Sequence, residues 1–273
     1  MFQRTLTALV GIAVIVAAVW WGAPWLTVLV VVIAVQGVRE VYRLLPHGAG
    51  PLPVALGAMW VIALILGAQA ASSLNNFLLI SAGILAAGSF ASLLWLVACY
   101  SGGRYLTAAL YLLGGPVYVG FLLAHSLALR DIGETGDVGR DWLLLSLLVV
   151  FATDSGAFLV GSTLGTHRMA PSLSPNKTWE GAAGGFILAV AAAVMLGLAI
   201  GVATPRWQLG VIGATVGVIA QCGDLLESKL KRLSNVKDAG NIIPGHGGVL
   251  DRLDSVVVSI PAVYYLLISV FEP

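Results

Sequence analysis

Stretches of about twenty consecutive apolar residues recur along almost the whole chain, and they limit its fold more than any other feature. A chain that crosses lipid must satisfy its backbone hydrogen bonds within itself, and long helices do so segment by segment. Hydrophobic residues make up 59% of the sequence, and the mean hydropathy is +0.96. These features exclude a water-soluble fold and predict an all-α, polytopic integral membrane protein.

We expect nine transmembrane helices joined by short polar connections rich in Gly, Pro and Ser. The expected spans are residues 5–21, 24–43, 52–71, 76–99, 106–129, 142–163, 181–203, 208–228 and 254–271. No connection is long enough to separate two folding domains. Residues 1–273 are therefore expected to form one membrane-embedded catalytic unit, with N-terminal spans in 1–100, middle spans and a cytoplasmic loop in 101–180, and C-terminal spans in 181–273.

The basic residues predict the orientation of the chain, because cytoplasmic loops retain Lys and Arg. Nine spans place three basic residues on one side, namely Arg130, Arg140 and Arg206. The other eleven fall on the opposite side, namely Arg4, Arg39, Arg43, Arg104, Arg168, Lys177, Lys229, Lys231, Arg232, Lys237 and Arg252. This asymmetry predicts a cytoplasmic N-terminus and a C-terminus outside. The net charge of +1 comes from near-equal totals and indicates no nucleic-acid partner.

The segment 223–255 concentrates charge in a chain of which only 10% is charged, and we interpret it as the active site. It carries two pairs of carboxylates spaced three residues apart, Asp224 with Glu227 and Asp251 with Asp254, at the cytoplasmic ends of the last two spans. Neighbouring lysines and arginines are the simpler partners for the first pair, and Asp251 is also a candidate N-cap. Two pairs on either side of one basic loop also suit Mg²⁺, which binds one or two carboxylates together with substrate phosphates.

Two further features are predicted to face the cytoplasm. Ser174 followed by Pro175 is typical of a helix N-cap, which would place Lys177 in the first turn of the seventh span, where an anion is favoured. A cap followed by an ordinary cytoplasmic lysine is the alternative. Asp154 lies within the sixth span, where a carboxylate indicates function unless a basic side chain pairs with it.

The turn containing His246, Gly247 and Gly248 would let backbone amides approach a phosphate, although a flexible turn has the same composition. Carboxylates for a metal, basic residues for phosphates and glycine-rich turns at one membrane face favour phosphoryl or nucleotidyl transfer to a lipid. A CTP-dependent lipid kinase has the same polar needs. A cation-coupled transporter also carries intramembrane carboxylates, but it places them near the midplane of repeated, interrupted helices.

Residues 228–254 resemble the signature of the phosphatidate cytidylyltransferases, also called CDP-diacylglycerol synthases, in the compact bacterial form. The matching positions are Ser228, Lys231, Arg232, Lys237, Asp238, His246, Gly247, Gly248, Asp251, Arg252 and Asp254. The upstream sequence SPNKTWEG resembles a second motif of the family, with Asn176 where a lysine is usual.

The resemblance implies that CTP and phosphatidic acid react to give CDP-diacylglycerol and pyrophosphate at the cytoplasmic face of the plasma (inner) membrane. It further implies a homodimer and a requirement for Mg²⁺, with K⁺ a candidate second metal, and the matching metal ligands are Asp224 and Asp251. We assign catalytic roles to Asp224, Asp251, Lys237 and Asp254. The residues assigned to substrate binding are Lys177, Ser174, Lys231, Arg232, His246, Gly247, Gly248, Arg252, Asp154, Glu227 and Asp238.

Overall fold

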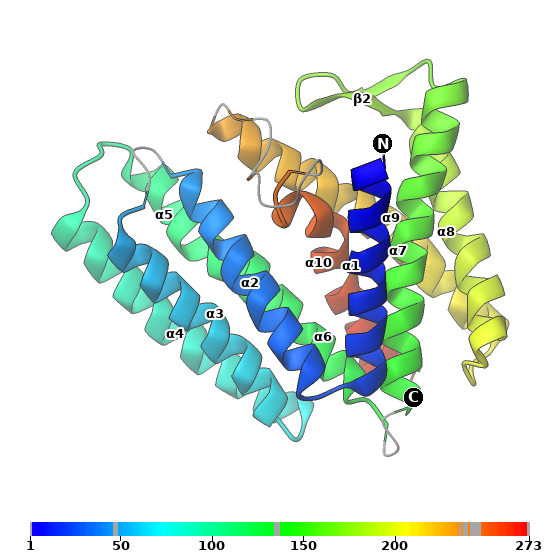
Figure 1. Cartoon of the computed structure of the whole chain (residues 1–273), viewed down its shortest axis with the longest axis horizontal. Helices are drawn as coiled ribbons and strands as arrows, with labels where there is room; N and C mark the ends of the chain where they lie inside the picture. Colours follow the sequence, from blue (N-terminus) through cyan, green and yellow to red (C-terminus); the bar gives the residue numbers. More distant parts are fainter. Residues whose placement is uncertain are drawn as a thin grey trace. The chain divides into compact units, whose positions relative to one another are not determined.

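Long helices make up nearly all of the described chain in the computed structural model (Figure 1). It describes residues 2–45, 49–133, 137–234, 236, 240 and 247–271, without the side chains of residues 2–6 and 8. The helices are α1 (Phe2–Trp21), α2 (Trp25–Arg43), α3 (Pro51–Ala70), α4 (Leu74–Cys99), α5 (Tyr105–Gly115), η1 (Pro116–Phe121), α6 (Leu122–Arg130), α7 (Asp137–Leu164), α8 (Trp179–Ile200), α9 (Arg206–Leu233), α10 (Leu250–Leu266) and η2 (Leu267–Phe271). The prediction of an all-α polytopic membrane protein is confirmed.

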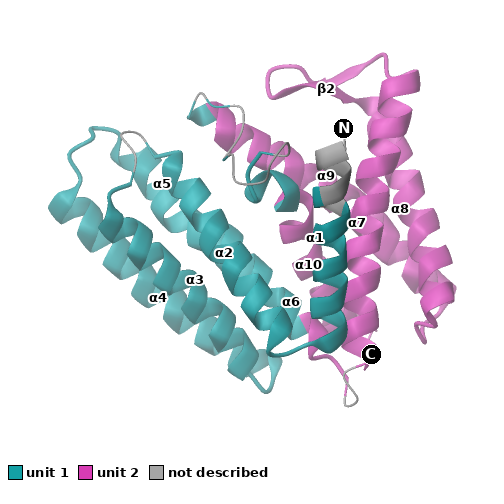
Figure 2. Ribbon diagram, viewed as in Figure 1, with its two compact units in different colours: residues 1–128, 233–253 teal, residues 129–232, 254–273 magenta. Residues whose placement is uncertain are grey.

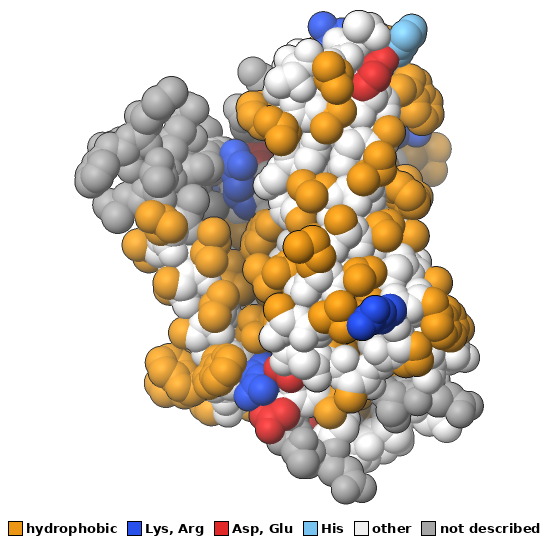
Figure 3. Space-filling view, turned by 90° about the vertical axis from the view of Figure 1, so that its right-hand side faces the viewer, with side chains coloured by type: hydrophobic (Ala, Val, Ile, Leu, Met, Phe, Trp, Pro, Cys, Tyr) orange, Lys and Arg blue, Asp and Glu red, His pale blue; other side chains and the backbone are white. Residues whose placement is uncertain are grey.

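Eight helical stretches in the described part of the chain are long and apolar enough to cross a bilayer. They correspond to the second through ninth expected spans, and α5, η1 and α6 together form one of them. The first expected span corresponds to α1, which contributes the shorter apolar stretch Leu9–Trp21. Figure 3 shows hydrophobic side chains spread over the length of the helices on one face, where charged side chains are few. Such a surface suits lipid and not water.

The chain divides into two units (Figure 2). Unit 1 contains residues 1–128 and 233–253, and unit 2 contains residues 129–232 and 254–273. The segment 223–255, which we call the signature segment, is thus divided between the units, because Asp224 and Asp254 belong to unit 2 whereas Asp251 belongs to unit 1. That all 273 residues form one catalytic unit stays a prediction.

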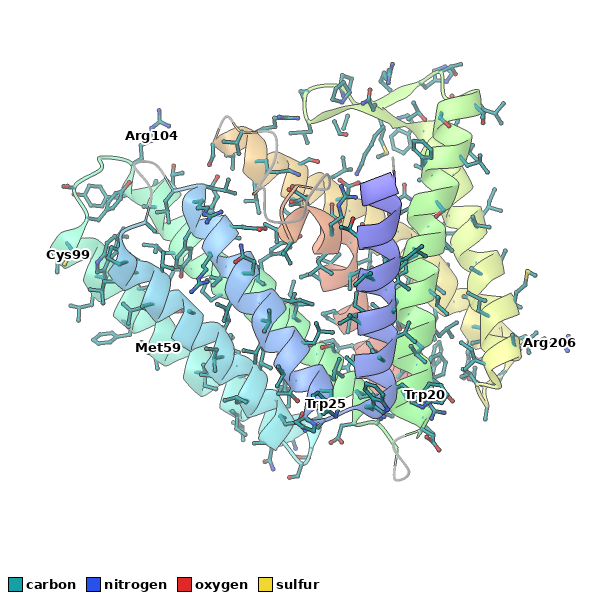
Figure 4. The ribbon with its side chains drawn as sticks, in the orientation of Figure 1. Trp20, Trp25, Met59, Cys99, Arg104 and Arg206 are labelled. Atoms are coloured by element: carbon teal, nitrogen blue, oxygen red, sulfur yellow. The ribbon has the colours of Figure 1, made fainter. Side chains whose placement is uncertain are left out.

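In unit 1, α2 packs against α3, and α3 packs against α4. The ring of Tyr42 on α2 is fully buried, and its hydroxyl donates to the carbonyl oxygen of Leu112 at 2.9 Å. A methyl group on Gly57 would lie 2.5 Å from that ring, so the glycine makes room for it. At the turn between α1 and α2, Trp20 and Trp25 are exposed (Figure 4), as suits indole rings at a membrane interface.

In unit 2, α8 packs between α7 and α9 through one stripe of small buried residues. These residues recur at every fourth position, namely Gly181, Gly185, Ala189, Ala193 and Gly197. A methyl group on Gly181 would lie 2.8 Å from the carbonyl oxygen of Ala157 on α7. Further along the same stripe α8 meets α9 at Gly213, where a methyl group would lie 2.8 Å from the carbonyl oxygen of Ala189. Close backbone approach through small residues is how helices associate in lipid, and it fixes the helices that carry the polar residues of unit 2.

Candidate active site

A β-hairpin, rather than a helix start, carries the residues 174–178. Strand β1 (Arg168–Ala170) pairs antiparallel with β2 (Ser174–Thr178), with Arg168 opposite Thr178. The guanidinium of Arg168 also donates to the carbonyl oxygen of Pro175. The prediction that Ser174 caps the seventh span, with Lys177 in its first turn, is therefore wrong.

The true N-cap of α8 is Thr178, four residues after the predicted one. Its backbone is extended, and its hydroxyl accepts a hydrogen bond from the amide of Gly181 at 3.1 Å. Glu180 occupies the first turn of α8, where a carboxylate is favoured by the helix dipole. This carboxylate accepts hydrogen bonds from Thr166 and His167, and it thereby ties the end of α7 to the start of α8.

The ion pair between Lys177 and Asp224 is the centre of the polar cluster in unit 2. The ammonium nitrogen of Lys177 lies 2.6 Å from Oδ2 of Asp224, and the side chains are 21% and 36% exposed, respectively. The nitrogen itself is buried, whereas the carboxylate remains partly accessible. The Lys177 side chain extends from β2 of the hairpin to Asp224 on α9. The pair therefore fixes the hairpin to the helix in which the signature segment begins. The lysine therefore neutralises a carboxylate in this structure.

A second ion pair lies one turn further along α9. Nζ of Lys231 lies 3.1 Å from Oε2 of Glu227, and the Glu227 side chain is only 2% exposed. Nearby, Nε of Arg232 donates to the carbonyl oxygen of Leu173 at 3.3 Å, so this arginine holds the turn of the hairpin. The prediction that basic neighbours pair with the carboxylates of α9 is confirmed for Glu227, while the partner of Asp224 comes from the hairpin.

Asp154 and Asp254 add two more carboxylates to the cluster. Both interact electrostatically with Asp224 and with Lys177, and Asp254 also has a side-chain hydrogen bond with Glu227. Helices α9 and α10 meet closely here, since a methyl group on Gly223 would lie 2.5 Å from the carbonyl oxygen of Asp254. Unit 2 thus brings together four acidic side chains from three helices.

The charge of this cluster suits a cation shared with a substrate. Four carboxylates gather around the ammonium groups of Lys177 and Lys231, and like charges at such a spot repel one another. No three His, Cys, Asp or Glu side chains within the described ranges are arranged to hold a metal by themselves. Mg²⁺ can bind one or two carboxylates and complete its shell with phosphate oxygens and water. Such an ion is compatible with the excess of carboxylates and with the lack of a three-residue metal site among the described residues.

In unit 1, Asp251 lies in the first turn of α10. Its Oδ2 accepts a hydrogen bond from the amide of Gly248 at 2.8 Å. Gly247 has a φ of 82°, a conformation that favours glycine, and a methyl group there would lie 2.8 Å from the same oxygen. The glycines therefore shape the chain around the Asp251 carboxylate. Arg252 follows in the same turn and is exposed.

Glu40, a buried glutamate on α2, is the hydrogen-bond acceptor that an N-cap side chain would otherwise provide for the first amides of α10. Its carboxylate accepts hydrogen bonds from the amides of Val249 at 3.0 Å and Leu250 at 2.8 Å. Those first amides of a helix have no acceptor within it. The interpretation of Asp251 as the N-cap is consequently wrong, because α10 begins at Leu250 and Glu40 fills the capping role.

Sequence reasoning missed Glu40, although a signal was present. It is an acid within an apolar span, the same signal that identified Asp154. The predicted site residues are divided between the two units. Unit 2 contains Asp154, Ser174 (in β2), Lys177, Asp224, Glu227, Lys231, Arg232 and Asp254. Unit 1 contains Gly247, Gly248, Asp251 and Arg252. Lys237, Asp238 and His246 lie outside the described residues. The assignment of one metal to Asp224 and Asp251 stays a prediction.

Comparison with known proteins gives matches over nearly the whole chain. A family model described as the cytidylyltransferase family matches residues 2–270. A protein of Staphylococcus saprophyticus named phosphatidate cytidylyltransferase is 32% identical over 268 residues, which are 98% of this chain and 99% of that protein. The protein of that name from Staphylococcus haemolyticus is 31% identical over 266 residues, or 97% and 98% of the two chains. A Bacillus subtilis protein of that name is 40% identical over 151 residues, 55% of each chain.

Proposed function

The chain belongs to the cytidylyltransferase family, and from this premise we propose that it transfers the cytidylyl group of CTP to phosphatidic acid. The products are CDP-diacylglycerol and pyrophosphate. The observation that carries the proposal is the match to the family model over residues 2–270, joined by relatives named phosphatidate cytidylyltransferase that align over almost their full length. The polar cluster of unit 2, set in helices long enough to span a bilayer, supports a reaction between a nucleotide and a lipid.

The reaction requires positioning more than a general base, because the phosphate of phosphatidic acid is already an anion at neutral pH. An oxygen of this phosphate attacks the α-phosphorus of CTP in line. A new P–O bond forms as the bond from the α-phosphorus to the bridging oxygen breaks, and that oxygen leaves with pyrophosphate.

Basic side chains neutralise the phosphates of both substrates. We assign this role to Lys177, Lys231, Arg232 and Lys237, and binding through Arg252 and the 246–248 turn to the same substrates. Asp154, Glu227 and Asp254 orient these cations, as the observed Lys231–Glu227 pair supports.

Asp224 and Asp251 would hold Mg²⁺, which supplies charge neutralisation at the nucleotide phosphates. The partial exposure of Asp224 and the excess of carboxylates over lysines around it support a cation at this residue. K⁺ is the proposed second metal, and a comparison of assays in KCl and NaCl tests it.

We also propose in which membrane the protein lies, which side its active site faces, and that it forms a homodimer. The eleven-to-three distribution of basic residues supports an active site that faces the cytoplasm of a bacterial inner (plasma) membrane. Labelling of single introduced cysteines with a membrane-impermeant reagent tests this orientation. The homodimer rests on the family resemblance, and sedimentation of the purified protein in detergent tests it.

The deciding experiment incubates the purified protein with phosphatidic acid and CTP labelled at either the α- or the γ-phosphate. We expect the α-label to enter the lipid phase and the γ-label to leave as pyrophosphate. Chelation by EDTA is expected to stop the reaction, and added Mg²⁺ to restore it. Transfer of the γ-label to lipid would instead indicate a lipid kinase, and no transfer of either label from CTP would refute the proposal.

A further inference from the structure

The connection between α9 and α10 is bound at both of its ends to the C-terminal end of α2. At its start, the hydroxyl of Ser234 donates to the carbonyl oxygen of Leu44 at 2.7 Å and lies 2.6 Å from the hydroxyl oxygen of Tyr111. At its end, the amides of Val249 and Leu250 donate to Glu40. Glu40 and Leu44 are four positions apart, which is about 6 Å along a helix. The chain therefore leaves and returns to α2 within roughly one helical turn.

Both carboxylate oxygens of Glu40 have hydrogen-bond partners, and glycines pack against them. Glu40 is fully buried, and each of its carboxylate oxygens accepts a hydrogen bond from a different backbone amide of the α10 start. Gln36 donates a further one at 3.1 Å. Methyl groups on Gly240 and Gly248 would lie 2.7 Å and 2.5 Å from its oxygens, so two glycines of the segment pack directly against this carboxylate.

We infer that Glu40 is a positioning residue for the cytidylyl transfer, acting through the start of α10. The negative carboxylate meets the positive end of the helix dipole and fixes the two amides that precede Asp251. The orientation of Asp251 and Arg252 is thereby set by α2, a helix that carries none of the signature residues. This inference rests on the proposed function for its effect on turnover, whereas the capping of α10 by Glu40 can be measured without any substrate.

Two substitutions separate the role of the carboxylate from that of its bulk. Glu40→Gln keeps the size of the side chain but offers one oxygen to two amides and turns an NH₂ group toward one of them. Glu40→Asp keeps both oxygens and the charge but is shorter. The matched control is Thr27→Val on the same helix, which loses the hydrogen bond from Thr27 to Gln69 at 2.6 Å, away from the signature segment.

We expect Glu40→Gln to lower kcat by about 10- to 100-fold, since small misplacements of reacting groups have effects of this size. The KM for CTP should change much less, and the thermal midpoint in detergent should stay close to that of Thr27→Val. Glu40→Asp should retain more activity than Glu40→Gln. Hydrogen exchange followed by mass spectrometry should show faster exchange of the Val249 and Leu250 amides in Glu40→Gln and no change there in Thr27→Val.

The inference is overturned if Glu40→Gln keeps the wild-type kcat, or if its loss of activity only follows a loss of folded protein. Greater activity of Glu40→Gln than of Glu40→Asp would also overturn it, because bulk would then matter more than charge. Should Glu40→Gln not fold, the question is decided in Glu40→Asp, by its kcat and by the exchange rates of its Val249 and Leu250 amides. An inactive wild-type protein with slowly exchanging amides would refute the proposed function and leave the anchoring by Glu40 supported.

Discussion

The two units stabilise their carboxylates in opposite ways. In unit 1, Glu40 is fully buried and accepts hydrogen bonds from neutral backbone and side-chain amides. In unit 2, Asp224 and Glu227 pair with lysines, and further acids lie close by. A carboxylate bonded to amides has fixed geometry and no mobile partner. A carboxylate paired with a lysine can exchange that partner for a metal or can release the lysine to a phosphate, so Asp224 is suited to chemistry in a way that Glu40 is not.

The largest effect is expected from Asp224→Asn, which should lower the rate of CDP-diacylglycerol formation by about 10³-fold. The neutral amide cannot balance Lys177 and is a poor ligand for Mg²⁺. The measurement is transfer of α-labelled CTP into lipid over a range of Mg²⁺ concentrations. Asp137→Asn is the control, because the Asp137 side chain is 65% exposed and lies outside the cluster. Near-normal turnover in Asp224→Asn would remove this residue from the active site.

Lys177→Met should lower turnover by about 10²-fold, since one phosphate-binding cation is lost and Asp224 loses its partner. The double variant Lys177→Met/Asp224→Asn should recover part of the thermal stability lost in Lys177→Met, because the unpaired charge of Asp224 is then removed. It should not recover activity. Recovered activity in the double variant would show that the pair is only structural, and the contrast between the units would then disappear.

Loss of either partner of the Glu227–Lys231 pair should lower stability, and Lys231→Met should also lower turnover because Lys231 is one of the proposed phosphate-binding cations. Removal of either partner from a buried pair leaves an unpaired charge, so Glu227→Gln or Lys231→Met should each lower the free energy of unfolding by about 3 kcal/mol. The variant with both changes should lose less than the sum of the two. Denaturant titration in detergent micelles measures the three values. Additive losses would indicate that the two side chains do not depend on each other.

The smallest effect is expected from Arg140→Gln at the start of α7. Arg140 pairs with Asp137, whose side chain is 65% exposed, and with Asp141, and pairs that are open to solvent contribute less than about 1 kcal/mol. Turnover should be unchanged. A loss comparable to that of Glu227→Gln would show that burial is not what separates strong from weak ion pairs in this protein.

The spans were predictable because hydropathy is local. The second to ninth expected spans each begin within four residues of the start of a helix, apart from the sixth, for which α7 begins at Asp137 instead of residue 142. That extra turn is polar and is held by Arg140, so hydropathy alone could not include it. The carboxylates of α9 and α10 were likewise visible as acids at the ends of spans.

The remaining errors come from contacts that sequence spacing does not show. Ser174 and Thr178 are equally good capping residues, and Thr178 caps α8 because Ser174 pairs with Ala170 in the hairpin. The hydrogen bonds that Glu40 accepts from Val249 and Leu250 join residues more than two hundred positions apart. The place of Glu40 within an apolar span marks it as a candidate, but no local pattern shows that its partners are the first amides of α10.

The small residues of α8 also determine which mutations this helix can accept. On the stripe from Gly181 to Gly197 even one added carbon meets a neighbouring helix, as the contact of Gly185 with the carbonyl oxygen of Thr153 illustrates. Ile187 and Met195 are exposed on the same helix and have room for any apolar side chain. Variation during evolution should therefore accumulate on the exposed side of α8. In a random mutational library, almost all substitutions in α8 that abolish function should fall on the stripe of small residues.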